Sequence, residues 1–101
     1  MNFIPYGKQT ITDDDIQGVI DVLKSDFLTT GPKVKEFEDA IAKYCGAKYC
    51  LAVSNGTAAL HLSSLVLLEQ NDKVLTTPNS FLATSNSILY VGAKPIFVDI
   101  Q

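Results

Sequence analysis

The chain of 101 residues contains no arginine: its eight basic residues are all lysines, and its net charge is −3. Without a basic stripe, binding to nucleic acid or to an anionic membrane surface is not expected. Only arginine offers a rigid two-pronged fork for a carboxylate or a diphosphate. Any such clamp would therefore have to come from other sequence or from another subunit.

Cysteine and histidine are also scarce, with two and one residues. Cys45 and Cys50 lack the spacing of a metal site, and His61 lies inside an apolar run. We predict all three as core residues of a protein from a reducing, cytoplasmic compartment. Residues 1–5 lack the basic start and apolar core of a signal peptide, and the apolar run 60–68 is too short to span a bilayer.

The first half predicts an extended arm, residues 3–10, followed by two amphipathic helices. Thr12 is a predicted N-cap, and three acidic residues follow it in the first turn, where they face the positive helix end; the helix continues to about Lys24. The second helix has Pro32 at its first position and stops at Gly46. The loop between the helices, residues 25–32, mixes aromatic, hydroxyl and glycine residues, which is typical both of ligand sites and of plain connections.

The second half alternates predicted strands and helices. Strands are expected at residues 50–53, at residues 73–77 and from about residue 94, with helices from Thr57 and from residue 79 to about Tyr90. This order predicts a parallel α/β sheet. The helix from Thr57 is apolar on nearly every side, so we expect it to be buried. Such a sheet needs cover on both faces, which 101 residues supply only in part, so we interpret the chain as part of a larger protein.

The turn at residues 54–57 is the candidate anion site. The N–H groups of residues 55–58 would be free at a helix N-terminus, Gly56 permits close approach, and Ser54 and Thr57 add hydroxyls. These groups favour a phosphate. An ordinary N-cap at Ser54 or Asn55, with Gly56 relieving the turn, accounts for the same residues equally well.

Ligands of parallel sheets lie beyond the carboxyl ends of the strands. This rule places the turn at residues 54–57, residues 77–81 and whatever follows Asp99 around one crevice. Phe81 is suited there to stacking on a flat ring, and a core position fits its pattern equally well.

Seven segments together resemble a known family. They are PYGKQ at residues 5–9, LTTGP at 28–32, FE at 37–38, YCGAKY at 44–49, SNGTAAL at 54–60, TPNSFLAT at 77–84 and VGAKPIFVD at 91–99. In order and spacing they resemble the amino-terminal quarter of the DegT-type sugar-nucleotide aminotransferases. Within that family the chain looks most like the transaminases that make UDP-4-amino-4,6-dideoxy-N-acetyl-altrosamine for pseudaminic acid.

The resemblance implies the three-layer α/β fold of aspartate aminotransferase (type I), of which this chain would be the amino-terminal portion of the large domain. Residues 1–47 would supply the arm and two helices, and residues 48–101 an incomplete parallel sheet. It also implies a homodimer and the cofactor pyridoxal 5'-phosphate. Asn55, Gly56 and Thr57 would hold the cofactor phosphate, and Phe81 would stack on the pyridine ring.

The resemblance further implies a sugar-nucleotide site. Tyr6 and the loop residues Asp26, Phe27, Leu28 and Thr29 would line it for a UDP- or dTDP-linked 4-keto-6-deoxy sugar. An amino acid, typically glutamate, would donate its amine to the cofactor, which then aminates the sugar. The pathway implied is the biosynthesis of pseudaminic acid or of a surface polysaccharide.

The chain departs from the family because it ends before the Schiff-base lysine and the acidic partner of the pyridine nitrogen. Its lysines at 48, 73 and 94 lie at predicted strand starts, opposite the crevice, and the others lie on helices or in the arm. We therefore predict no catalytic residue here and no activity of this chain alone. Two alternatives stay open: a dehydratase of the same fold with histidine in place of that lysine, and a non-catalytic module that binds a phosphate ligand.

Overall fold

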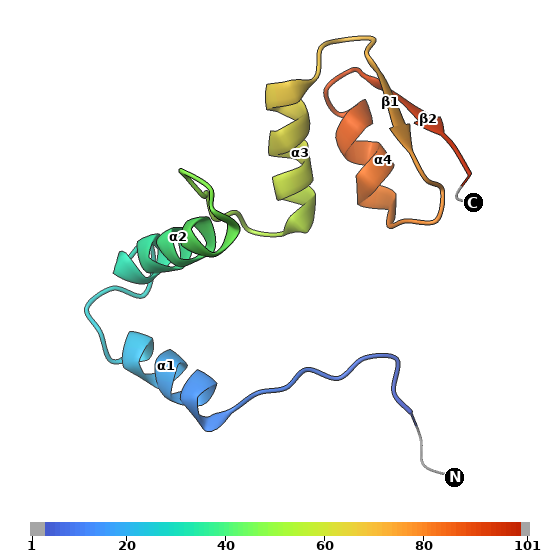
Figure 1. Ribbon diagram of the computed structural model, residues 1–101. Coiled ribbons are helices and arrows are strands. Elements are labelled where there is room, and N and C mark those ends of the chain that lie inside the picture. Colours follow the sequence, from blue (N-terminus) through green and yellow to red (C-terminus); the bar gives the residue numbers. More distant parts are fainter. Residues whose placement is uncertain (1–3, 100–101) are drawn as a thin grey trace. The chain divides into compact units, whose positions relative to one another are not determined.

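The computed structural model describes residues 4–99, and the chain divides into two compact units, Met1–Ala52 and Val53–Gln101. Figure 1 labels the helices and strands. In chain order they are α1 (Asp13–Leu23), α2 (Pro32–Cys45), α3 (Gly56–Leu67), β1 (Lys73–Thr76), α4 (Leu82–Leu89) and β2 (Lys94–Phe97). No helix within residues 4–99 is both long and apolar enough to cross a membrane.

Helix α1 begins with the predicted cap. The Thr12 hydroxyl accepts the Asp15 N–H at 3.4 Å, while the Asp15 carboxylate accepts the Thr12 N–H at 2.7 Å and the Thr12 hydroxyl at 2.8 Å. These reciprocal bonds form a capping box. The Thr12 N–H and hydroxyl together lower the pKa of the Asp15 carboxyl below its ordinary value, so the first turn is held by a charged acceptor.

Helix α2 also has the predicted ends. Pro32 occupies its first turn, and Gly46 closes it with a φ of 66°, in the left-handed region that glycine adopts without strain. Glu38 accepts the Ala52 N–H at 2.8 Å and so fastens the segment after the helix back onto it. The Lys33–Glu36 ion pair, at 2.5 Å, is exposed, so it contributes little to stability.

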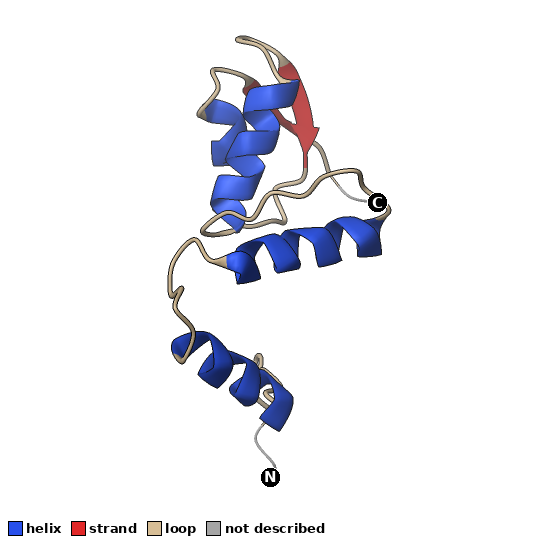
Figure 2. Cartoon of the chain, turned by 90° about the vertical axis from the view of Figure 1, so that its left-hand side faces the viewer, coloured by secondary structure: helices blue, strands red, loops and turns tan. Residues whose placement is uncertain are grey.

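The second unit is built around a parallel strand pair joined by α4. The register runs from Lys73 opposite Lys94 to Thr76 opposite Phe97, and the Val98 N–H extends it by donating to the Thr76 carbonyl at 2.9 Å. The predicted strand, helix, strand order of this part is confirmed. In Figure 2 helices α3 and α4 stand beside the two strands.

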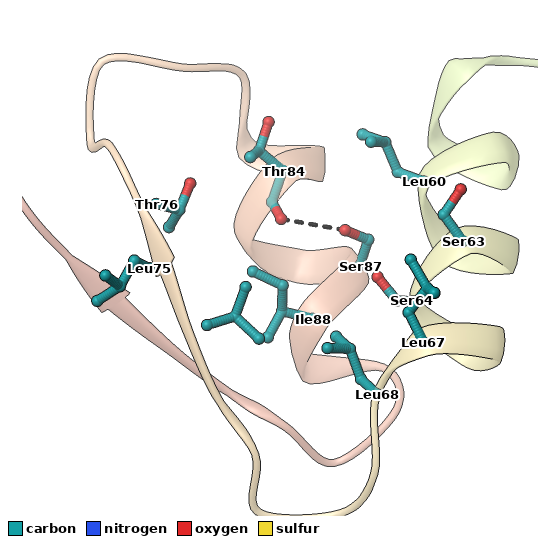
Figure 3. Close-up of a pocket in the computed structure, with 11 residues that line it drawn as sticks. Leu60, Ser63, Ser64, Leu67, Leu68, Leu75, Thr76, Thr84, Ser87 and Ile88 are labelled. Carbon is teal, nitrogen blue, oxygen red and sulfur yellow. Dashed lines mark hydrogen bonds between the residues drawn. The ribbon is translucent and has the colours of Figure 1, made fainter.

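The small core of this unit lies where α4 meets α3 and the strands. Ala83, Ser87, Ile88 and Ala93 are buried, together with Ser64 of α3. Most are small, which lets the two helices approach closely, and the Ser87 hydroxyl is satisfied by donating to the Thr84 carbonyl at 3.0 Å (Figure 3). The packing fixes α3 and α4 as neighbours.

Three predictions about burial and pairing are wrong for the described residues. Residues 50–53 form no strand, because a strand needs a backbone partner and no described residue pairs with them. Helix α3 has a single buried residue, and its Leu65, Val66 and Leu67 are exposed. Cys45 is exposed as well. An apolar side chain is buried only when another element covers it, which a local pattern does not reveal.

Candidate functional site

The first turn of α3 is organised by Asn55. Its side-chain oxygen accepts the Ala58 N–H at 2.9 Å, and its side-chain nitrogen donates to the Ser54 hydroxyl at 3.2 Å. Its carbonyl accepts the Ala59 N–H at 3.2 Å. Asn55 is therefore an N-cap, and the Ala58 N–H is not free for a ligand, contrary to the prediction for residues 55–58.

Four donors at this helix end remain without a partner in the described part of the chain. They are the N–H groups of Asn55, Gly56 and Thr57 and the Thr57 hydroxyl. All four lie at the positive end of the α3 dipole, which favours an anion. The lack of an intrahelical acceptor for them follows from the geometry of any helix start, so the donors alone do not make a site.

Gly56 adds a second observation. Its φ is not positive, and a Cβ built on it would have no atom within 4 Å. Neither the backbone conformation nor packing within residues 4–99 thus requires glycine, and the suggestion that Gly56 relieves the turn is wrong. A residue without a side chain leaves the helix end open to close approach by a ligand.

Phe81 lies beside this helix end. It is the N-cap residue of α4, and its side chain is 79% exposed, so the alternative core position is excluded for the described residues. An open pocket of about 510 Å³ joins the two helix starts. It is lined by Gly56, Thr57, Ala59, Leu60, Phe81, Ala83 and Thr84.

The lining of this pocket combines two chemistries. Unpartnered N–H donors lie at Gly56 and Thr57, and an aromatic ring is offered by Phe81. No lining residue carries a charge. A ligand with a phosphate at one end and a flat ring at the other matches this arrangement. Thr84 also lines the pocket and was not predicted as a site residue. The sequence feature that could have indicated it is the spacing of its hydroxyl, four residues after that of Ser80.

A second pocket, of about 260 Å³, lies between α3, α4 and β1 (Figure 3). The side chains of Leu60, Leu67, Leu68 and Ile88 line it, and it also carries serine and threonine hydroxyls, of which those of Ser64 and Ser87 lie in the buried contact between the two helices. No charged residue, histidine or cysteine lines it. Because no base lies beside the hydroxyls to activate them, it is not the candidate site.

The candidate sugar-nucleotide residues lie in the other unit. Tyr6 is fully exposed in the arm, and the loop residues Asp26, Phe27, Leu28 and Thr29 are all exposed. Ser25 shapes this loop by donating to the Val22 carbonyl at 2.8 Å and accepting the Phe27 N–H at 3.3 Å. Of the five predicted residues, Leu28 lines a groove with α1 and Lys33.

The lysines at the strand starts occupy the predicted edge. Lys73 and Lys94 are opposite one another at the amino-terminal ends of β1 and β2. Phe81 follows the carboxyl end of β1, at the other edge of the sheet. The backbone of these two lysines therefore lies at the edge of the sheet opposite the pocket.

Comparison with known proteins decides the family. Residues 9–101 match the DegT/DnrJ/EryC1/StrS aminotransferase family. The chain belongs to this family. It is 43% identical over 98 residues to the UDP-4-amino-4,6-dideoxy-N-acetyl-beta-L-altrosamine transaminase of Campylobacter jejuni, covering 97% of this chain and 26% of that protein.

Solved structures of the family agree with the fold. A putative sugar aminotransferase of Streptococcus pneumoniae, solved in PLP and PMP forms, has a TM-score of 0.87 for the PLP form at 37% identity, over 97% of this chain and 25% of that one. The GDP-4-keto-6-deoxy-D-mannose-3-dehydratase of Escherichia coli has a TM-score of 0.86 at 30% identity, over 96% and 27%. The family and fold class predicted from the sequence are confirmed, and the chain spans about a quarter of the length of these relatives.

Proposed function

We propose that the whole protein is a pyridoxal-phosphate aminotransferase that moves an amino group from an amino acid, with glutamate as the expected donor, to a nucleotide-linked 4-keto-6-deoxy sugar. The observation that carries the proposal is the single pocket shared by Gly56, Thr57 and Phe81 in a member of this family. The proposal includes a UDP- or dTDP-linked sugar, a homodimer and a cytoplasmic role in pseudaminic acid or surface polysaccharide biosynthesis.

The phosphate would be held by neutral donors. The N–H groups of Gly56 and Thr57 and the Thr57 hydroxyl lie at one helix end, where the helix dipole adds to their attraction for an anion. The Asn55 side chain caps the helix and fixes those donors in place. The Asn55 backbone N–H would still hold the phosphate together with those of Gly56 and Thr57.

Phe81 would set the plane of the cofactor ring by stacking against it. Ala59, Leu60 and Ala83 supply the apolar remainder of the pocket wall and would keep water from that face. When bound, the cofactor supplies the electron sink that the transfer of an amine requires. The chain's contribution is thus to bind and orient.

The sugar nucleotide would lie against Tyr6, Asp26, Phe27, Leu28 and Thr29. Their exposure leaves them available, and a loop of mixed aromatic and hydroxyl residues suits a sugar and a base. Because the chain contains no arginine, a bidentate clamp on the diphosphate would come from other sequence or from a partner subunit.

The test uses the full-length protein with pyridoxal phosphate, a visible absorbance spectrum, and borohydride reduction followed by peptide mass analysis. We expect a lysine outside residues 1–101 to carry the reduced cofactor. The matched variants are Thr57→Val, which removes one donor, and Ser63→Ala, whose hydroxyl donates only to the Ala59 carbonyl on the same helix. Thr57→Val should weaken cofactor binding and Ser63→Ala should not. Absence of any binding would refute the proposal.

A sugar dehydratase is the second candidate, favoured by the similarity to the Escherichia coli dehydratase. Both reactions use the same cofactor in the same fold, so binding alone does not separate them. Cofactor bound without a reducible lysine adduct would indicate the histidine-type dehydratase. Product analysis separates them directly, since an aminotransferase adds nitrogen to the sugar and a dehydratase removes a hydroxyl.

A further inference from the structure

We infer that the Ser80–Thr84 hydroxyl pair is the positioning element for the Phe81 ring; this rests on the proposed function of the pocket. The two hydroxyl oxygens are 2.8 Å apart, and they bracket Phe81 on either side of the start of α4.

Phe81 needs such an element because little else holds it. Its side chain is 79% exposed, so few packing contacts restrict its rotamers. As the N-cap of α4 it also has no polar atom to bond the free N–H groups of the first turn. The direction in which the ring leaves the chain, along the Cα–Cβ bond, is therefore set by the backbone at residue 81.

The hydroxyl pair fixes that backbone from both sides. The Thr84 N–H donates to the Phe81 carbonyl at 3.0 Å, while the Thr84 hydroxyl reaches past Phe81 to the Ser80 hydroxyl. Together these bonds close one turn around Phe81, as a capping box closes the turn after an ordinary N-cap. A ring on a closed turn loses less freedom when it stacks on a ligand.

A direct ligand-binding role fits these hydroxyls less well. Phe81 and Thr84 line both the pocket at Gly56 and a neighbouring pocket of about 220 Å³ that also includes Thr77, Ser80 and Ser85. The hydroxyls that line this neighbouring pocket all have hydrogen-bond partners nearby in the sequence. Thr77 accepts the Asn79 N–H, Ser85 donates to the Leu82 carbonyl, and Ser80 and Thr84 bond each other. They are engaged in shaping the turn.

The test measures pyridoxal phosphate affinity and the induced circular dichroism of the bound cofactor in the full-length protein. Thr84→Val and Ser80→Ala should each weaken binding about fivefold, the size expected for one exposed hydrogen bond, and should weaken the dichroism band. The double variant should be no worse than either single one, because both remove the same bond. Thr84→Ser keeps the hydroxyl and should restore both signals.

Two controls make the result decisive. Ser85→Ala removes a hydroxyl from the same turn but not this bond, so it should leave the affinity unchanged. In a Phe81→Leu background, Thr84→Val should have no further effect if it acts through the ring. An equal loss in both backgrounds would overturn the inference. So would wild-type affinity in Ser80→Ala and Thr84→Val, whereas no binding by the wild-type protein would instead refute the proposed function.

Discussion

Gly56→Ala gives the sharpest test of the phosphate site, because it should change stability and cofactor affinity in opposite directions. A Cβ at residue 56 would have no atom within 4 Å, and residue 56 has no positive φ. Alanine should therefore be accommodated, and replacing glycine in a helix typically adds up to about 1 kcal/mol of stability, less in the first turn. The thermal midpoint of the apo protein should stay the same or rise.

The same methyl group should weaken binding. In a helix the Cβ leans toward the N-terminus, which at Gly56 is the side from which a phosphate would approach. Displacing the phosphate from even one N–H would cost about 1.5–3 kcal/mol, the value for a hydrogen bond to a charged group. That corresponds to a dissociation constant roughly ten to a hundred times higher.

The assay is a titration of the apo full-length protein with pyridoxal phosphate, alongside thermal melting of each apo variant. Gly18→Ala in α1 is the matched control, since its Cβ would also have no atom within 4 Å; it should leave the cofactor affinity unchanged. Unaltered affinity in Gly56→Ala would refute the reasoning and leave the turn as a plain helix cap. Loss of both stability and affinity would show instead that residue 56 is packed by other parts of the protein.

Four further predictions concern the Phe81 ring, helix α1 and the segment after helix α2. Phe81→Leu should weaken cofactor binding by about 1 kcal/mol, or roughly fivefold, as stacking is lost, and a cofactor titration measures it. Thr12→Ala should cost α1 about 1 kcal/mol, seen as faster amide exchange over residues 13–23. The lowered pKa of Asp15 means that its contribution to the stability of α1 is complete above about pH 4, the ordinary range for an aspartate, and is lost as the pH falls through the lowered value. The protection of the α1 amides, relative to the exchange rate of an unstructured peptide at the same pH, should fall there, and should not in Asp15→Asn. Glu38→Ala should speed exchange of the Ala52 N–H, which donates to that carboxylate at 2.8 Å; an unchanged rate would show that the bond is not formed in solution.

The parts of the fold that the sequence predicted correctly depend mostly on local signals, at the ends of helices and in the order of the elements. The cap at Thr12, the proline at residue 32 and the glycine at residue 46 define helix ends through short-range bonds and allowed φ values, and all three lie where expected. The parallel pairing of β1 and β2 followed from their strand, helix, strand order.

The failures all involve partners distant in the sequence. Residues 50–53 have the apolar composition of a buried strand, yet no residue of the described range 4–99 pairs with their backbone. The composition of α3 likewise predicted cover on sides where its leucines are exposed. At the site, free donors were predicted for residues 55–58, but the Asn55 side chain takes one of them, a choice that depends on a single rotamer.

The order of contacts along the chain has a consequence for folding. β1, α4 and β2 form one continuous βαβ unit, and its strands pair residues as near in sequence as Lys73 and Lys94. Contacts between nearby residues cost less loop-closure entropy and form early. The residues by which α3 packs on α4, such as Ser64 and Ser87, are about as near in sequence as the paired strand residues. We therefore expect the aromatic wall and the anion-binding wall of the pocket to form in the same early step of folding.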